Sequence, residues 1–118
     1  MAKNRPSLRA PRTKAFNKQN GRCYYCNLPM WIDDVSSFSQ RYELTLKQAQ
    51  LFKCTGEHLI AFHEGGTTNQ SNIVAACYYC NSRRHKPKEA LSPERYKKKV
   101  QSRMRSGKWH TGFISIAC

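Results

Sequence analysis

The sequence lacks long apolar runs. No stretch approaches the roughly 20 apolar residues that a membrane span requires. The N-terminal residues 1–6 carry basic side chains with no apolar run behind them, so they do not form a secretory signal. With no export signal we expect a cytoplasmic protein and no membrane partner. Its cysteines should stay reduced and available to metal.

Acidic residues are also scarce. Lys and Arg number 21 against 7 Asp and Glu, which gives a formal net charge of +14 on 118 residues. So large an excess favours a polyanionic partner, with nucleic acid first and an acidic membrane surface as the alternative. Because only 39% of the residues are hydrophobic, the core should be modest, and a structural metal would supplement it.

The chain is expected to form one domain with basic extensions at both ends. Residues 1–15 should be a flexible basic arm, since residues 1–22 hold seven basic and no acidic side chains and few large apolar ones. This arm is interpreted either as a contact to a nucleic-acid backbone or as a solvated tail. Residues 16–90 should form the folded domain, and residues 91–118 a basic helix and tail.

The cysteines follow a repeated motif. Cys-Tyr-Tyr-Cys occurs at 23–26 and again at 77–80, and two further cysteines stand apart at 54 and 118. Two such pairs supply four thiolates, the number and donor type of a tetrahedral structural Zn²⁺ site. The expected zinc ligands are Cys23, Cys26, Cys77 and Cys80. Disulfides in an exported protein and a redox Cys-x-x-Cys are the alternatives, and the bulky tyrosines between the thiols favour metal.

Local patterns predict a small α+β fold. The capping-box sequence 45–48 predicts a short helix with Leu46, Ala49 and Phe52 on one face. Segments 57–62 and 72–76, separated by the turn-forming 64–67, predict a β-hairpin with a long loop.

Two helices are expected after the hairpin. A short helix over 81–85 would place Asn81 and His85 on one face. Ser92 as N-cap followed by Pro93 then opens a final helix that ends near Gly107. Its apolar stripe consists of Tyr96, Val100 and Met104.

Residues around the first predicted strand suit phosphodiester hydrolysis. His58 can act as general base, because an imidazole titrates near neutral pH. Glu57 beside it offers a hard oxygen ligand for Mg²⁺ or Mn²⁺, and Asn81 or His85 could complete a sparse ligand set. This combination predicts a nuclease centre with one ion and one base.

The order of these motifs resembles the HNH endonucleases, in particular the small zinc-containing ones. The resemblance rests on Glu57-His58-Leu59, Gly65-Gly66, the run 72–77 and Cys80-Asn81-x-x-Arg84, and it covers roughly 23–86. It implies a ββα-metal (His-Me finger) domain in which the hairpin and the following helix hold one catalytic divalent ion.

The resemblance also implies roles for single residues. His58 falls on the general base, Glu57 on a metal ligand, and Asn72 on the residue that buttresses the hairpin loop. Asn81 falls on the third motif position and His85 on a further ligand used by some members, so which of them binds the ion is left open. Glu57 stands where Asp is usual, and the usual proline after the base is absent.

Partner contacts are expected from the basic run beside this centre. We predict phosphate contacts from Arg83, Arg84, Lys86 and Lys88. The four motif tyrosines should cover the zinc site, with base stacking as the alternative. The sequence thus predicts a metal-dependent endonuclease acting on DNA, most simply double-stranded, as a monomer or homodimer. The rival hypothesis is a non-catalytic zinc-ribbon module that binds nucleic acid.

Overall fold

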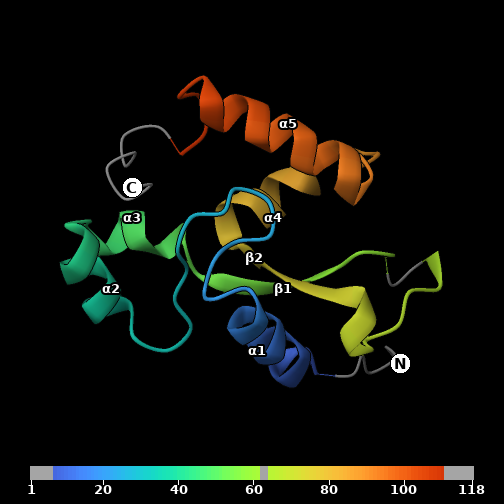
Figure 1. Ribbon diagram of the computed structural model, residues 1–118, viewed down its shortest axis with the longest axis horizontal. Coiled ribbons are helices and arrows are strands. Elements are labelled where there is room, and N and C mark those ends of the chain that lie inside the picture. Colours follow the sequence, from blue (N-terminus) through green and yellow to red (C-terminus); the bar gives the residue numbers. More distant parts are fainter. Residues whose placement is uncertain (1–6, 62–63, 111–118) are drawn as a thin grey trace.

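The structure is a computed structural model that describes residues 7–61 and 64–110. Its elements follow the order α1 (Arg9–Lys18), α2 (Val35–Tyr42), α3 (Leu46–Gln50), β1 (Cys54–His58), η2 (Gln70–Asn72), β2 (Ile73–Cys77), α4 (Tyr78–Arg84) and α5 (Pro93–Arg105). Figure 1 shows α1 on one side of the hairpin β1–β2, with α4 and α5 on the other side. The predicted α+β class is confirmed.

The hairpin is antiparallel, with Cys54 opposite Cys77 and His58 opposite Ile73. Its first strand therefore begins before the predicted segment 57–62 and ends at His58. The prediction is wrong for residues 59–61, and Phe62 lies outside the described residues. The reason is local. Both backbone groups of Ile60 are hydrogen-bonded to the side chain of Asn72 instead of to a neighbouring strand.

Helix α4 lies along β1. The amide of Asn81 donates to the hydroxyl oxygen of Thr55 over 2.9 Å, and His85, just past the helix end, faces Glu57 at 3.0 Å. The four-residue step from Asn81 to His85 spans about 6 Å along the helix, and the two-residue step from Thr55 to Glu57 spans about 7 Å along the strand. The two pairs of residues can therefore face each other. The prediction that Asn81 and His85 share a face is confirmed. The helix begins earlier than expected, at Tyr78, because the Cys77 sulfur accepts from the backbone N–H of Cys80 and caps it.

The prediction of a flexible arm over residues 1–15 is wrong for the part that the structure describes. Residues 9–18 form α1, and Ala15 is buried against the hairpin. The helix was not apparent from sequence because its packed face carries small or polar groups. Gln19, just past its end, pairs with the backbone of Ala75, to which it donates through Nε2 and from which it accepts through Oε1, both at 2.9 Å. Residues 1–6 lie outside the described range.

The remaining helices surround the core. The capping box at Thr45 and Gln48 is present, and Ala49 and Phe52 are buried, but Leu46 is 56% exposed and does not share their face. Helix α2, which the sequence analysis did not predict, is capped by the carboxylate of Asp34, which accepts from the N–H of Ser37.

Helix α5 has the predicted Ser92 cap, and its stripe packs onto the core through buried Tyr96 and Val100. The Tyr96 hydroxyl donates to the carbonyl of Cys80 over 2.6 Å. This contact ties α5 to the second cysteine motif.

Candidate metal centre and active site

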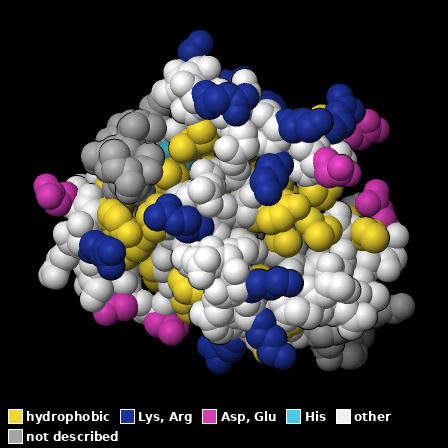
Figure 2. All heavy atoms as spheres, in the orientation of Figure 1, with side chains coloured by type: hydrophobic (Ala, Val, Ile, Leu, Met, Phe, Trp, Pro, Cys, Tyr) yellow, Lys and Arg dark blue, Asp and Glu magenta, His cyan; other side chains and the backbone are white. Residues whose placement is uncertain are grey.

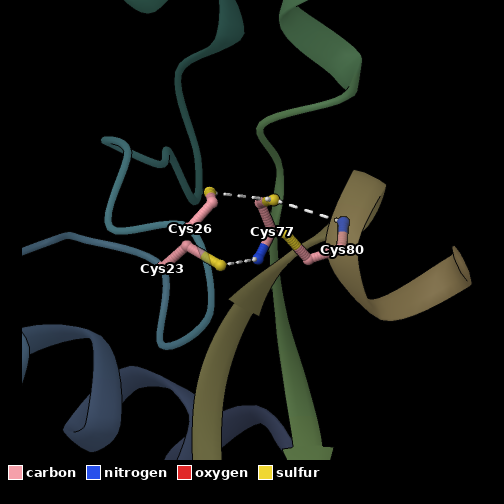
Figure 3. A group of neighbouring side chains, drawn as sticks. All are labelled: Cys23, Cys26, Cys77 and Cys80. Carbon is pink, nitrogen blue, oxygen red and sulfur yellow. Dashed lines mark hydrogen bonds between the residues drawn. The ribbon is translucent and has the colours of Figure 1, made fainter. Parts of the chain in front are cut away.

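Four buried cysteines converge where the hairpin meets α4 (Figure 3). They come from the loop after α1 and from the junction of β2 with α4, namely Cys23, Cys26, Cys77 and Cys80. Their sulfurs all lie within 4.8 Å of one another. Sulfurs at the corners of a tetrahedron around Zn²⁺ are about 3.8 Å apart, and the Cys26–Cys77 pair is separated by 3.9 Å. The four residues therefore fit a structural zinc ion.

Backbone N–H groups point at these sulfurs. Cys23 accepts from the N–H groups of Tyr25 and Cys77, both at 3.3 Å, as expected for sulfurs that carry negative charge. Burial raises the pKa of the Cys77 and Cys80 thiols well above the ordinary value. Four neighbouring thiolates therefore require a compensating cation.

Two residues for which the sequence predicted no role in the metal site contact the cysteine cluster. The indole Nε1–H of Trp109 donates to the sulfur of Cys80 over 3.2 Å, and Nε2 of His110 lies 3.5 Å from the sulfur of Cys77. Burial lowers the pKa of His110 to about 4, so the ring is neutral at neutral pH. Outer contacts of this kind orient metal ligands. No motif position indicated them, because they lie about thirty residues beyond the second cysteine pair.

The carboxylate of Glu57 is the best-anchored polar group near the hairpin. It is 3% exposed. Its Oε2 accepts from the hydroxyl of Tyr25 at 3.0 Å and from Nη1 of Arg84 at 2.6 Å. Its Oε1 faces Nε2 of His85 at 3.0 Å. Burial and the Glu57 charge raise the pKa of Tyr25 far above its ordinary value, so its hydroxyl stays a donor.

Glu57 and His85 could hold a divalent ion between them. Two ligand atoms at right angles around an ion that binds oxygen at about 2.1 Å are about 3.0 Å apart, as Oε1 and Nε2 are. His85 is 46% exposed and lines an open cleft of about 770 Å³ between segment 59–61 and segment 84–93. The donor set and the access both fit an ion that retains water ligands. Asn81 is directed at Thr55 rather than at Glu57.

Asn72 braces the chain that follows His58. Its buried amide accepts from the N–H of Ile60 at 2.8 Å and donates to the carbonyls of Ile60 and Thr67 at 3.1 and 2.7 Å. Its own carbonyl accepts from the N–H of Leu59 at 2.8 Å. The half-buried His58 thus stands where the strand ends and this braced loop begins. Side chains alternate along a strand, so His58 and Glu57 leave β1 on opposite faces.

The basic run has two different environments. Arg83, Lys86 and Lys88 are exposed, with the guanidinium of Arg83 3.5 Å from the centre of the Tyr79 ring. Arg84 is 7% exposed and is engaged by Glu57 and by the carbonyl of Leu91. The prediction that Arg84 contacts phosphate does not fit this position, since a phosphate would have to displace Glu57.

The four motif tyrosines also differ in burial and in their contacts. Tyr25 is fully buried, and Tyr79 contacts the rings of Trp109 and His110 beside the cysteine cluster. Tyr78, in contrast, is 51% exposed. Tyr24 is half-buried under the ammonium of Lys97.

The hairpin and the following helix bring a buried carboxylate next to an imidazole, and four cysteines cluster beside them. This arrangement defines a small ββα-metal domain. Residues 47–87 match the family model described as HNH endonuclease. The predicted resemblance to the HNH endonucleases is thereby confirmed over this segment. No curated protein matches the chain. Among the described helices, none is long and apolar enough to cross a membrane.

Proposed function

We propose that the protein is a metal-dependent endonuclease that hydrolyses phosphodiester bonds of double-stranded DNA and carries a structural zinc ion on its four cysteines. The observation that carries the proposal is the geometry of Glu57. One of its oxygens is held by Tyr25 and Arg84, and the other is directed at the accessible imidazole of His85.

Glu57 and His85 are the proposed protein ligands of the catalytic Mg²⁺ or Mn²⁺. When bound, this ion offsets the charge that develops on the scissile phosphate and on the leaving 3′ oxygen. Other divalent transition metals suit the imidazole donor as well. Asn81 supports this pair by fixing α4 to Thr55 in β1.

His58 is the proposed general base. It takes a proton from the attacking water, and the attack on phosphorus leaves 5′-phosphate and 3′-hydroxyl ends. Asn72 keeps the chain after His58 in one conformation through its contacts to Ile60 and Thr67. Because Glu57 and His58 leave opposite faces of β1, the phosphate is expected at the loop end of the hairpin, where both side chains can reach it.

The exposed cations supply the binding surface. Figure 2 shows lysine and arginine side chains spread over the whole visible face, whereas acidic side chains are fewer. Arg83, Lys86 and Lys88 are exposed close to His85 and are the proposed phosphate contacts of the site.

One observation favours the second candidate, a non-catalytic module that binds nucleic acid. The Glu57–Arg84 ion pair at 2.6 Å is nearly inaccessible, as a purely structural pair would be. The four-cysteine cluster is compatible with both functions.

The ends of the products distinguish the two functions. Purified protein would be incubated with a labelled duplex and Mg²⁺ or Mn²⁺, and the products tested for religation. Religatable fragments are expected from the parent and from Glu89→Gln, which alters an exposed carboxylate of the same cleft. Glu57→Gln and His85→Ala should lose cleavage by at least about 100-fold. Intact duplex under every condition would support the binding module.

A further inference from the structure

We propose that a second groove, on the α1 side of the hairpin, binds one strand of DNA and leads it toward His58. This inference rests on the proposed function. The groove has a volume of about 830 Å³ and is called the basic groove below. Its charged and aromatic lining residues are Arg9, Arg12, Lys53 and Tyr78, and Gly56 of β1 lines it as well.

The groove forms because α1 approaches β1 at a glycine. A side chain beginning at Gly56 would lie 3.4 Å from Cβ of Leu8 and 3.5 Å from Cβ of Arg12, so the helix packs almost directly on the strand backbone. The opposite wall is fixed as well. The backbone N–H of Tyr78 donates to the carbonyl of Lys53 over 2.8 Å. One wall of the groove thus belongs to α1, and the other consists of Lys53 and Tyr78, which a backbone hydrogen bond holds together.

The electrostatics of the groove are one-sided. Three cationic side chains line it, and none of the described residues that line it is a carboxylate. Within residues 7–61 and 64–110, the ion pairs join Glu57 to Arg84 and to His85, and neither involves a groove residue. The Nε–H of Arg12 is buried without a hydrogen-bond acceptor among the described residues. Cations that have no carboxylate partner among the described residues suit an anionic chain such as a phosphate backbone.

Tyr78 indicates that the occupant carries bases as well as phosphates. It is the most exposed of the four motif tyrosines, and its ring lines the groove beside Lys53. An exposed aromatic ring beside cations is the arrangement with which proteins hold single strands, because a base stacks on the ring while its phosphates meet the cations. An acidic peptide would use the cations but would have no need of the ring.

The position of the groove connects it to the hydrolytic site. Gly56 and His58 lie two residues apart on the same face of β1, about 7 Å along the strand. A DNA strand in the groove beside Gly56 therefore lies on the face of β1 from which the proposed base projects. The contact between Glu57 and His85, and the cleft that His85 lines, lie on the α4 side of the hairpin.

The test measures binding of a fluorescein-labelled oligo-dT by fluorescence anisotropy, in the His58→Ala background so that nothing is cleaved. The double variant Arg9→Ala/Lys53→Ala removes two groove cations. Lys14→Ala/Lys18→Ala removes the same charge from exposed positions of α1 that do not line the groove. The groove double should weaken binding by about 10-fold or more and reduce the salt slope by about 1.4, with less than about 3-fold loss in the control.

The ring is tested separately. Tyr78→Ala should weaken oligo-dT binding by at least about 5-fold, and Tyr78→Phe should restore it. Equal losses in the two double variants, or unchanged binding by Tyr78→Ala, would overturn the proposal. Displacement of oligo-dT by polyglutamate at equal charge concentration would overturn it as well, because the groove would then be a general anion site.

Failure of the groove and failure of the nuclease are distinguishable. If the parent cleaves duplex DNA and both double variants bind oligo-dT equally well, the nuclease function holds and the groove proposal fails. If the parent never cleaves DNA but only the groove double variant binds oligo-dT poorly, the groove holds as a nucleic-acid site and the hydrolytic function fails. Zinc content equal to the parent's shows that each variant is folded.

Discussion

At the scale of single residues, the two oxygens of Glu57 have different tasks. Tyr25 and Arg84 both donate to Oε2, which leaves Oε1 for His85 and an ion. Tyr25 lies between two zinc-site cysteines, so its hydroxyl connects the four-cysteine cluster directly to the proposed catalytic carboxylate. Tyr25 and Arg84 are therefore positioning residues for Glu57.

The two donors should differ in their effects. Arg84→Ala leaves a nearly inaccessible carboxylate without its cation and should destabilise the fold by about 3 kcal/mol or more. Tyr25→Phe removes one of two donors, and we expect about a 10-fold loss of Mn²⁺ affinity with little loss of stability. Urea unfolding and Mn²⁺ titration followed by electron paramagnetic resonance measure both effects. A Tyr25→Phe protein with parental Mn²⁺ affinity would contradict the positioning role.

The sequence indicated Glu57, His58, Asn72, Asn81 and His85 together, because the family spacing is carried by a strand, a loop and a helix in fixed order. It did not indicate Tyr25 as a partner of Glu57, since the two are 32 residues apart. Arg84 was misplaced for a related reason. A basic residue in a basic run resembles its exposed neighbours, and only the packing of α4 on β1 shows that it faces inward.

At the scale of elements, the loop after His58 depends on Gly66. A Cβ at this position would lie 1.8 Å from the carbonyl oxygen of Ile60, the residue that Asn72 braces. Nothing lies within 4 Å of a Cβ at the neighbouring Gly65, although its φ of +90° disfavours any other residue. Gly66 is thus required because a Cβ would have no space, whereas Gly65 is favoured by its backbone conformation.

Gly66→Ala should displace the Ile60 backbone and reduce cleavage by at least about 100-fold while zinc content stays parental. Gly65→Ala adds only backbone strain, about 1–2 kcal/mol, and should reduce cleavage less. Rates on a labelled duplex and zinc determination compare the two variants. If Gly65→Ala were the more damaging, the collision at Ile60 would not explain the requirement for Gly66.

Helix α1 shows what periodicity could not predict. Its packing uses Ala15, the Gly56 backbone and the Gln19 amide in place of a large apolar stripe. Gln19→Ala would leave the fully buried backbone N–H of Ala75 without its acceptor and should cost about 1–3 kcal/mol. Gln19→Glu keeps the acceptor but places a carboxylate oxygen against the carbonyls of Arg22 and Ala75, to which Nε2 donates at 2.7 and 2.9 Å, and should also destabilise the protein in urea unfolding. Equal stability of all three proteins would show that α1 is not held by this contact.

At the scale of the whole molecule, the four-cysteine cluster joins segments far apart in sequence. It connects the loop after α1 to the β2–α4 junction, while Trp109 and His110 bring the chain after α5 to the same place. The cysteine pairs and α5 were predicted correctly because their signals are local. The approach of 109–110 was not, since it arises from tertiary packing.

Removal of zinc should therefore unfold the domain rather than merely inactivate it. Treatment with a strong zinc chelator, or Cys80→Ser, is expected to abolish the cooperative thermal transition, because structural zinc binding provides about 10 kcal/mol or more in small domains. Cys54→Ser, which alters a buried cysteine outside the cluster, should keep one zinc per chain. Circular dichroism and metal analysis make the comparison. A chelated protein with parental secondary structure and melting would contradict this role.

The central claim is that this domain hydrolyses DNA with a divalent ion and His58. The most direct measurement incubates supercoiled plasmid with parent and His58→Ala proteins of equal zinc content, each with Mg²⁺ or Mn²⁺ and each with EDTA. The account predicts nicked or linear plasmid for the parent only when the ion is present, with a loss of at least about 100-fold in the variant, which should still bind DNA. Parental cleavage by His58→Ala, or retarded but intact plasmid in every lane, would contradict it.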